Sequence, residues 1–263
     1  MAPSTSAWPL CIVHGRKSTH FRRESSPLLA QVVVAFARLE NSALAAAEAN
    51  TLIIGYFYLL RLGEYLGGPD PILDDFFRFR NLAMWVGARA IASLTCPTIA
   101  DRRAATFATL TFTRQKNGIR GEKVGHGRSG HPQICPVLCL VERVRALRSI
   151  SVPPSTPLNA FGPSTPGGPL RYIITRKLTV RLRTALLIYP DPSYSPFDVS
   201  ARSTRVDGAM ALLCAGVDRD RIRMIGRWRS DEMFRYLHLQ AQPLMTGVSA
   251  AMLHGGTFQL APG

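Results

Sequence analysis

The chain has 263 residues, of which 46% are hydrophobic and 19% are charged, and 32 Lys and Arg against 17 Asp and Glu give a formal net charge of +15. This length and apolar content exclude a disulfide-stapled miniprotein and a disordered basic tail, and they predict a domain with a buried core. The basic balance favours a polyanionic partner, with nucleic acid ahead of an anionic membrane surface. Most of the basic residues are arginines, whose planar fork can bind two phosphate oxygens at once.

Cysteine usage and hydropathy indicate where the protein works. The five cysteines are scattered, with no CxxC pair and no histidine at metal-ligand spacing, which indicates a reducing compartment and no zinc site. Pro9 interrupts the first apolar stretch, so no export signal is predicted. The longest apolar run, Leu52 to Leu60, has about half the ~20 residues that a membrane span needs. We therefore expect a soluble, intracellular protein.

The first predicted elements are helical. Residues 1–25 mix Pro and Ser with basic residues and show no period, which is typical of a flexible basic arm. Apolar residues then recur at helical spacing over 26–66, with strong helix formers at 43–49, and this pattern predicts two helices. A Gly-Gly pair at 67–68 closes the segment.

Strand patterns follow the helices. Residues 82–86 and 104–113 are predicted strands, and in the second one Ala, Leu and Phe alternate with Thr, as in a half-buried strand. The Asn-Gly pair at 117–118 favours a hairpin turn with a return strand near 119–124. A small antiparallel sheet is therefore expected in the middle of the chain.

The next segments combine one helix with one loop. Pro136 suits the first turn of a helix that has an apolar stripe on one face and Glu142, Arg143 and Arg145 on the other. Residues 151–170 are rich in Pro, Ser and Gly, and predict a long surface loop.

The rest of the chain is predicted to be mainly helical. Helices are expected at 174–188, 203–215, 218–225 and 231–240, the last two with Asp218 and Ser230 as N-caps, and a weakly helical piece is expected near 244–253. The order of helices, small sheet and further helices predicts an α+β fold that is mainly helical. One domain over 26–240 is expected, with a tail at 241–263.

Several polar residues have a chemistry that suits an anion. Arg61 lies three residues before Glu64 at the end of an apolar helix, where a local ion pair is the simpler interpretation. Lys116 lies beside the predicted hairpin turn, where a solvated charge is the default. Arg202 and Arg205 are three apart at a helix start and can offer two guanidinium groups to one anion.

An aromatic pair follows in the last predicted helical segment. Trp228 belongs to a Gly-Arg-Trp sequence just before Ser230, and Tyr236 lies eight residues after it. A tyrosine on an amphipathic helix is more often a core or rim residue than a nucleophile, so this pair alone assigns no function.

Taken in chain order, these residues resemble the catalytic domain of the tyrosine recombinases, the phage-integrase family. Three segments carry the resemblance: 59–64 (LLRLGE), 201–210 (ARSTRVDGAM) and 226–237 (GRWRSDEMFRYL). The last is the most specific, in a form associated with recombinases of eukaryotic mobile elements. The resemblance covers residues 26–240 and implies that family's fold, a small antiparallel sheet flanked by helices.

The resemblance implies a reaction on DNA. The Tyr236 hydroxyl would attack a phosphodiester, leaving a 3′-phosphotyrosyl bond and a free 5′-hydroxyl that can rejoin another strand. Arg61 and Arg205 would stabilise the charge on the nonbridging oxygens. Lys116 would protonate the departing 5′-oxygen, with Lys123 as the reserve candidate.

The remaining roles and partners also follow from the resemblance. Trp228 would donate its indole N–H toward the phosphate, and Arg202 would hold the phosphate. Neither a cofactor nor a metal is expected. The implied partners are double-stranded DNA and further copies of the chain, as a dimer or tetramer on DNA. No membrane partner is expected, and the location would be with DNA, in the nucleus if the source is eukaryotic.

Three departures from the family pattern leave alternatives open. Arg202 stands where the family usually has histidine, and cannot act as a base near neutrality. Asp207 stands where small residues are usual, and can form a competing ion pair with Arg205. Residues 1–25 are too few to supply the family's N-terminal DNA-clamping domain, which we expect this chain to lack. The alternatives are a catalytically inactive DNA-binding remnant of a mobile-element recombinase, and an arginine-rich RNA-binding protein.

Two other candidate sites rank lower. His126 and His131 lie in a Gly-rich segment, but no strand-to-helix phosphate-loop sequence surrounds them. Cys135 and Cys139 fall on one helix face and are expected to be small core residues rather than ligands.

Overall fold

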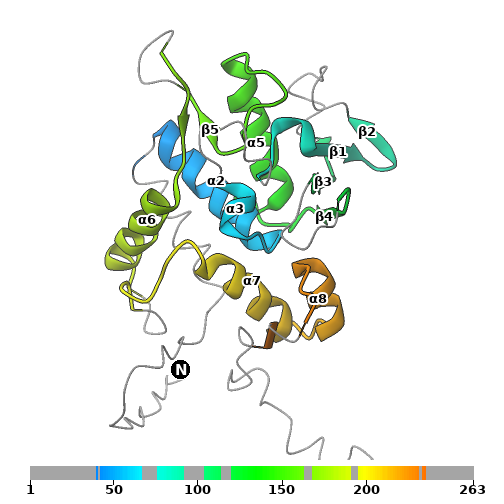
Figure 1. The fold of residues 1–263 in the computed structure, drawn as a ribbon, viewed down its shortest axis with the longest axis vertical. Coiled ribbons are helices and arrows are strands. Elements are labelled where there is room, and N and C mark those ends of the chain that lie inside the picture. Colours follow the sequence, from blue (N-terminus) through cyan, green and yellow to red (C-terminus); the bar gives the residue numbers. More distant parts are fainter. Residues whose placement is uncertain are drawn as a thin grey trace, which may run out of the picture.

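Helices and a small antiparallel sheet make up the described part of the chain (Figure 1). The computed structural model describes residues 40, 42–66, 76–91, 104–113, 120–162, 168–190, 195–230 and 233–234. The helical elements are α2 (Ala43–Phe57), α3 (Leu62–Tyr65), the 3₁₀ turn η1 (Phe79–Asn81), α5 (Pro136–Ser149), α6 (Thr175–Ile188), α7 (Ser203–Cys214) and α8 (Arg219–Gly226). The strands are β1 (Leu82–Val86), β2 (Arg89–Ile91), β3 (Phe107–Thr111), β4 (Lys123–Gly127), β5 (Ala160–Phe161) and β6 (Arg171–Tyr172). The predicted mixture of helices with a small antiparallel sheet is confirmed.

The main sheet has four strands in the order β2-β1-β3-β4, each antiparallel to its neighbour. In and just after β3, Ala108, Leu110 and Phe112 are buried while the threonines between them are more exposed, so the predicted alternation is confirmed. This half-buried pattern gives the sheet one face against the helices. β1 has the predicted bounds, and β2 was not predicted.

The return strand β4 begins later than the predicted 119–124. The Gly121 N–H still donates a hydrogen bond to the carbonyl of Phe112 beyond the end of β3. Gly121 bends the chain there with a φ of +76°. A positive φ is accessible to glycine without a steric cost, so Gly121 delays the regular pairing to Lys123. The Asn-Gly turn at 117–118 lies outside the described residues.

Helix α5 forms much of the core. Pro136 occupies its first turn, as predicted, and the predicted stripe is buried at Val137, Leu140, Val141, Val144 and Leu147. Arg143, however, is only 1% exposed, so its predicted place on the polar face is wrong. Its guanidinium donates hydrogen bonds to the carbonyls of Leu158 and Ala160, which makes the burial of the charge tolerable.

The prediction of a surface loop over 151–170 holds only in part: residues 151–155 are mostly exposed, residues 156–161 are not, and residues 163–167 lie outside the described part of the chain. Residues 156–161 are buried, and β5 at their end pairs with β6, which follows the segment. The side chain of Asn159 donates to the carbonyl of Ile173, and the chain around Thr156 bonds to Phe79. Pro and Gly set the turns here, but the backbone groups between them bond to the core.

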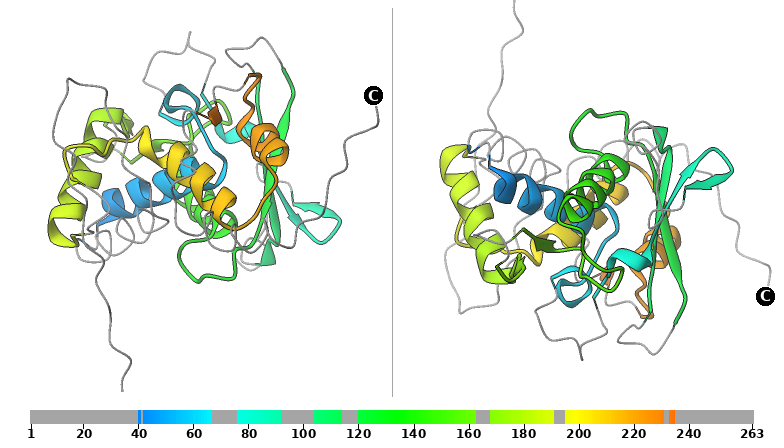
Figure 2. Two further views of the ribbon diagram at one scale, coloured as in Figure 1. Left: turned by 90° about the horizontal axis from the view of Figure 1, so that it is seen from below. Right: turned by 90° about the horizontal axis from the view of Figure 1, so that it is seen from above.

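Helix α2 lies between α5 and α7, so it is buried on several sides (Figure 2). Helix α6 lies at the end of the molecule opposite the four-stranded sheet in both views. Helices α6, α7 and α8 lie close to their predicted bounds, α7 ending before Gly216 with φ +76° and α8 beginning at the N-cap Asp218. These helices bring residues 203–228 back against α2.

Several predictions fall outside the described residues: the arm at 1–25, the first part of the predicted helical segment at 26–39, most of the helix at 231–240, and the tail at 241–263. Of that last helix, the structure describes residues 233–234 as a 3₁₀ turn. Cys135 and Cys139 are buried beside α5, as predicted, and burial raises the pKa of the Cys139 thiol to about 12. Among the described helices, none combines the length and the apolar character required to cross a bilayer.

Candidate functional site

The site is built on the turn that ends α8. Asp218 caps the start of this helix by accepting hydrogen bonds from the N–H groups of Asp220 and Arg221. At its end, Arg227 adopts a left-handed conformation with φ 57° and ψ 39°, and the Trp228 N–H donates to the Arg223 carbonyl. This is a helix-ending geometry for which glycine is the usual residue. The turn directs the carbonyls of Gly226 and Arg227 toward side chains from α7 and the start of α3, and the Arg227 side chain toward Glu64.

Gly226 is required beside Trp228. A Cβ on this glycine would lie 1.6 Å from the Trp228 ring, inside the van der Waals radius of its carbon atoms. The indole therefore packs directly over the backbone of the turn, and Trp228 is only 8% exposed. The tryptophan belongs to a second, smaller hydrophobic cluster, which also contains Leu59, Met210 and Ile222.

Arg61 reaches the turn from the start of α3. Its Nη2 donates to the carbonyl of Arg227 at 3.4 Å, and its Nη1 lies 3.1 Å from Oε1 of Glu64. The other oxygen of Glu64 accepts from the backbone N–H of Arg61 at 2.6 Å. The Arg61 side chain is 33% exposed, so one side of the guanidinium faces solvent while the other is fixed.

Arg205 reaches the same turn from α7. Its Nη2 donates to the carbonyl of Gly226 at 2.6 Å, and its guanidinium carbon lies 4.2 Å from the centre of the Trp228 ring. This is a cation–π contact, and it holds the guanidinium against the face of a buried ring. Arg205 is 9% exposed.

The start of α7 is itself anchored on α3. The hydroxyl of Tyr65 donates to the carbonyl of Ala201 at 3.2 Å and lies 3.3 Å from the hydroxyl of Thr204. Burial raises the pKa of Tyr65 to about 12, so it remains a neutral hydrogen-bond donor. Arg61 and Arg205 are therefore carried by two helices that are bound to each other as well as to the turn.

Arg61 and Arg205 thus donate to the carbonyls of two consecutive residues, Arg227 and Gly226. The Arg61 bond joins segments that lie 166 residues apart in the chain, while the Arg205 bond spans 21 residues. Two arginines fixed on one turn give a site of positive charge with oriented donors, which suits a phosphate or another oxyanion.

The other predicted site residues lie away from this turn or outside the described residues. Arg202 is exposed at the N-cap of α7, one turn before Arg205. Lys123 is exposed at the first position of β4, on the strand that returns from the predicted hairpin. Lys116 and Tyr236 lie outside the described residues. The structure therefore brings together Arg61, Arg205 and Trp228 of the predicted set.

Arg227 is a residue of this site that the sequence did not single out. Its side chain is fully buried and pairs with Glu64, Nη2 to Oε2, at 2.9 Å. Burial lowers the pKa of Arg227, and the Glu64 carboxylate opposes this effect. Glu64 is thus shared by Arg61 and Arg227. The Gly-Arg-Trp sequence marked this position, but its left-handed backbone could not be read from the sequence.

Three tyrosines near the site, Tyr56, Tyr58 and Tyr65, are poor candidates for a nucleophile. Burial is the main cause that raises the pKa of each above its ordinary value. The negative charge of Asp207, which is fully buried, raises the pKa of Tyr56 further. The hydroxyl of Tyr58 donates to the Ala108 carbonyl at 2.9 Å. All three therefore hold their protons near neutral pH.

The lower-ranked histidines have structural roles. Nδ1 of the exposed His131 accepts from the backbone N–H groups of Gln133 and Ile134, which closes a turn. His126 packs edge-on against the Tyr58 ring, with the centroids 4.7 Å apart, and burial lowers its pKa to about 4. Within the described ranges, no group of three or more His, Cys, Asp or Glu side chains is placed to hold a metal ion.

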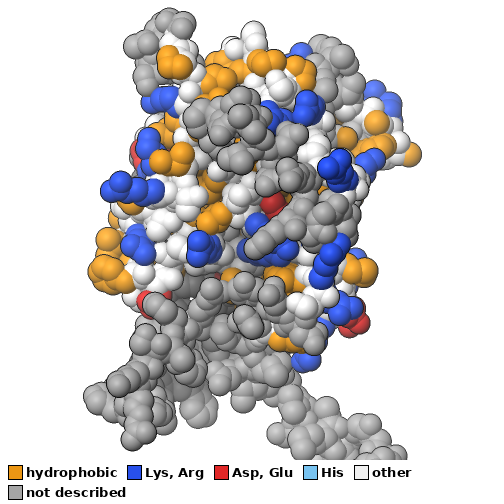
Figure 3. Space-filling view, in the orientation of Figure 1, with side chains coloured by type: hydrophobic (Ala, Val, Ile, Leu, Met, Phe, Trp, Pro, Cys, Tyr) orange, Lys and Arg blue, Asp and Glu red, His pale blue; other side chains and the backbone are white. Residues whose placement is uncertain are grey.

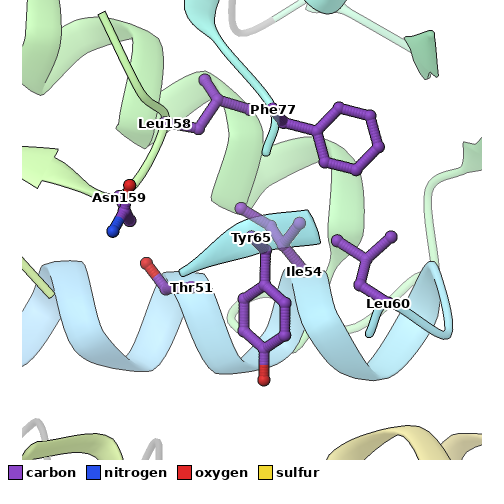
Figure 4. A pocket seen from close by; sticks show the side chains of 7 residues that line it. All are labelled: Thr51, Ile54, Leu60, Tyr65, Phe77, Leu158 and Asn159. Atoms are coloured by element: carbon purple, nitrogen blue, oxygen red, sulfur yellow. The ribbon is translucent and has the colours of Figure 1, made fainter. Parts of the chain in front are cut away.

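One small pocket lies behind α3, on the inner side of the segment that carries Arg61 (Figure 4). It is lined by Thr51, Ile54, Leu60, Tyr65, Phe77, Leu158 and Asn159. The cavity volume is about 10 Å³, which is at the limit for one water molecule. This pocket has no room for an organic cofactor.

Basic side chains also lie on the described surface outside the site. On the face drawn in Figure 3, Lys and Arg side chains are spread over the described surface with few acidic ones between them. Such a surface attracts polyanions from solution. No family model matches this chain, and no curated protein matches it.

Proposed function

We propose that the protein is a DNA strand-cleaving and rejoining enzyme with the fold and chemistry of a tyrosine recombinase, acting in DNA recombination or integration. The observation that carries the proposal is the placement of Arg61 and Arg205 on consecutive carbonyls of the turn before Trp228. A phosphodiester needs its two nonbridging oxygens stabilised during transfer, and two fixed guanidinium groups supply that stabilisation.

In the proposed reaction, the hydroxyl of Tyr236 attacks the DNA phosphorus atom. The phenol proton of Tyr236 passes to solvent water as its oxygen attacks, the bond to the 5′-oxygen breaks and a 3′-phosphotyrosyl bond forms. The departing 5′-oxygen takes a proton from Lys116 or, in reserve, from Lys123, and the lysine regains a proton from water. Attack by a 5′-hydroxyl of another strand reverses these steps and releases Tyr236. The number of phosphoester bonds is conserved, so the cycle needs no external energy source.

Trp228 and Arg202 support this chemistry in different ways. Trp228 makes a cation–π contact with Arg205 and so helps to hold its guanidinium in place. Arg202 is exposed on the same helix end, where it adds positive charge for a DNA phosphate. The basic surface and the formal net charge of +15 favour double-stranded DNA as the partner, on which copies of the chain assemble. The proposed location is with DNA.

The test is covalent capture of DNA. A nicked duplex, whose short 5′-hydroxyl fragment diffuses away after cleavage, is incubated with the full chain and then with SDS. Wild type is expected to form an SDS-resistant adduct, and Tyr236→Phe is expected to form none while keeping salt-sensitive DNA binding. Tyr172→Phe, at a partly buried tyrosine in β6, is the matched control and is expected to form the adduct.

Two results would contradict the proposal in different ways. DNA binding by wild type without any adduct would favour the inactive DNA-binding remnant. Preference for structured RNA over duplex DNA in direct competition would favour an RNA-binding protein, and the recombinase interpretation would be wrong.

A further inference from the structure

The guanidinium of Arg227 holds together the segment that carries Arg61. Its Nη1 donates to the carbonyl of Tyr58 at 3.2 Å, and its Nη2 donates to the carbonyl of Leu59 at 3.2 Å and to Glu64 at 2.9 Å. These three acceptors flank Arg61 in sequence on both sides. A single buried side chain therefore fixes the backbone before Arg61 and the carboxylate after it.

The conformation of this segment needs such support. Leu59 has a φ of +47°, in the left-handed region that side chains with a Cβ disfavour. The Arg227 hydrogen bond falls on the carbonyl of this strained residue. Strained residues of this kind persist only where their surroundings hold them, and they cluster at functional sites.

The backbone of Arg227 carries the other half of the site. Its own carbonyl accepts from Arg61, the preceding carbonyl accepts from Arg205, and the following side chain, Trp228, stacks on Arg205. The side chain of Arg227 thus contacts the segment that carries Arg61. Its two neighbours in the chain, Gly226 and Trp228, contact Arg205.

The side chain of Arg227 is closed off from solvent. The Arg227 side chain has no exposed surface, and its guanidinium carbon lies 4.0 Å from the centre of the Phe112 ring in the core. It can act on a reaction only through the residues that it holds.

We propose that Arg227 is a positioning residue that sets the distance and orientation of Arg61 relative to Arg205. This inference rests on the proposed function, because the two arginines are its phosphate-binding groups. An arginine suits the task since its planar fork reaches two carbonyls and a carboxylate at once, which the single ammonium of lysine cannot do. The left-handed backbone at this position would favour glycine, so the side chain is retained here against the local preference.

The test compares Arg227→Gly and Arg227→Lys in the full chain with wild type, by single-turnover cleavage of the nicked duplex at saturating DNA. Glycine tolerates the left-handed turn and removes the whole Arg227 side chain, including its three hydrogen bonds to residues 58–64, so we expect the rate to fall about 100-fold, with the DNA Kd within about threefold of wild type. For Arg227→Lys, which keeps a charge beside Glu64, we expect a loss of about tenfold. Arg223→Lys, on the exposed side of α8, is the control and should cleave at the wild-type rate.

A second measurement separates positioning from a general loss of structure. Thermal melting identifies a temperature at which each variant is folded, and rates are measured there. In an Arg61→Ala background, the penalty of Arg227→Gly is expected to shrink at least about tenfold, because the residue that it positions is gone. A merely structural role would leave the two penalties multiplicative.

The outcomes are distinct. If wild type forms the adduct and both Arg227 variants, or the folded one of them, cleave at the wild-type rate, the inference is wrong and the proposed function stands. Multiplicative penalties likewise overturn the inference. If wild type forms no adduct, the proposed function fails and takes the inference with it.

Discussion

Gly208 of α7 lies directly against the carbonyl of Tyr56 in α2: a Cβ on Gly208 would stand 2.4 Å from that oxygen and 2.7 Å from the side chain of Leu59. The two helices approach this closely because one of them has no side chain at the contact. Gly208 is three residues after Arg205, so the same contact sets how far Arg205 projects toward the turn at the end of α8.

Gly208→Ala is therefore expected to destabilise the protein by about 1 to 3 kcal/mol, since backbone atoms must move to admit the methyl group. Gly63→Ala is the matched control, because a Cβ on Gly63 of α3 meets nothing within 4 Å. This control is expected to be neutral or to stabilise by up to about 1 kcal/mol. Urea unfolding measures both, and a Gly208→Ala protein as stable as wild type would contradict the contact.

Glu64→Ala is expected to cost about 3 to 5 kcal/mol in the free energy of unfolding, because it leaves the buried guanidinium of Arg227 without its counter-charge. Glu142→Ala removes a carboxylate from an exposed pair with Arg145, and is expected to cost about 1 kcal/mol or less. Chemical denaturation of both variants checks the difference. Equal effects would show that Glu64 does not stabilise the site.

His126 should make the stability depend on pH in the acid range. Its pKa is lowered by burial from 6.5 to about 4 in the folded protein, so the unfolded chain binds the proton more readily. Stability contributed by the neutral ring is present above pH 6.5 and is lost as the pH falls toward 4. The loss between pH 7 and 4.5 is expected to be about 2 kcal/mol.

His126→Phe isolates this effect, since a phenyl ring can take the place against Tyr58 without titrating. Urea unfolding at pH 7 and 4.5 is expected to show a smaller loss for the variant than for wild type by about the same 2 kcal/mol. Identical pH dependence in the two proteins would mean that His126 is not buried as described.

Arg143→Met is expected to destabilise the protein by about 2 to 4 kcal/mol. Methionine fills part of the space but donates no hydrogen bond, so the buried carbonyls of Leu158 and Ala160 lose their partner. Limited proteolysis is the second readout, and faster cleavage within 151–162 is expected. Arg145→Met, on the exposed side of the same helix, should change neither measurement.

Local patterns predicted the elements well where the determinants are local. Pro136 at a first turn, Asp218 as an N-cap and Gly216 after a helix each act on neighbouring residues, and the structure has each in its predicted place. The alternation around Leu110 likewise depends only on one face of one strand. Such features are visible in a single sequence because their partners are a few residues away.

The misplaced features depend on partners far along the chain. Arg143 is polar by composition, and its burial follows from carbonyls 15 and 17 residues later. Residues 156–161 also have a loop composition, and they are buried where two of their carbonyls bond to that arginine. For the site, spacing and resemblance singled out Arg61, Arg205 and Trp228, which the structure brings to one turn. The sequence did not predict a role for Arg227, because that role depends on a backbone conformation and on hydrogen bonds to residues more than 160 positions away.

The bonds between Arg227 and residues 58–64 span 163 to 169 positions, which has a consequence for biosynthesis. A ribosome makes Glu64 and Arg61 early and Arg227 only after most of the chain has emerged. During that interval the Glu64 carboxylate lacks the Arg227 guanidinium, and the face of α2 that packs against α7 is uncovered. The nascent chain therefore exposes apolar surface that promotes aggregation, and we expect it to need a chaperone until the last helices have been synthesised.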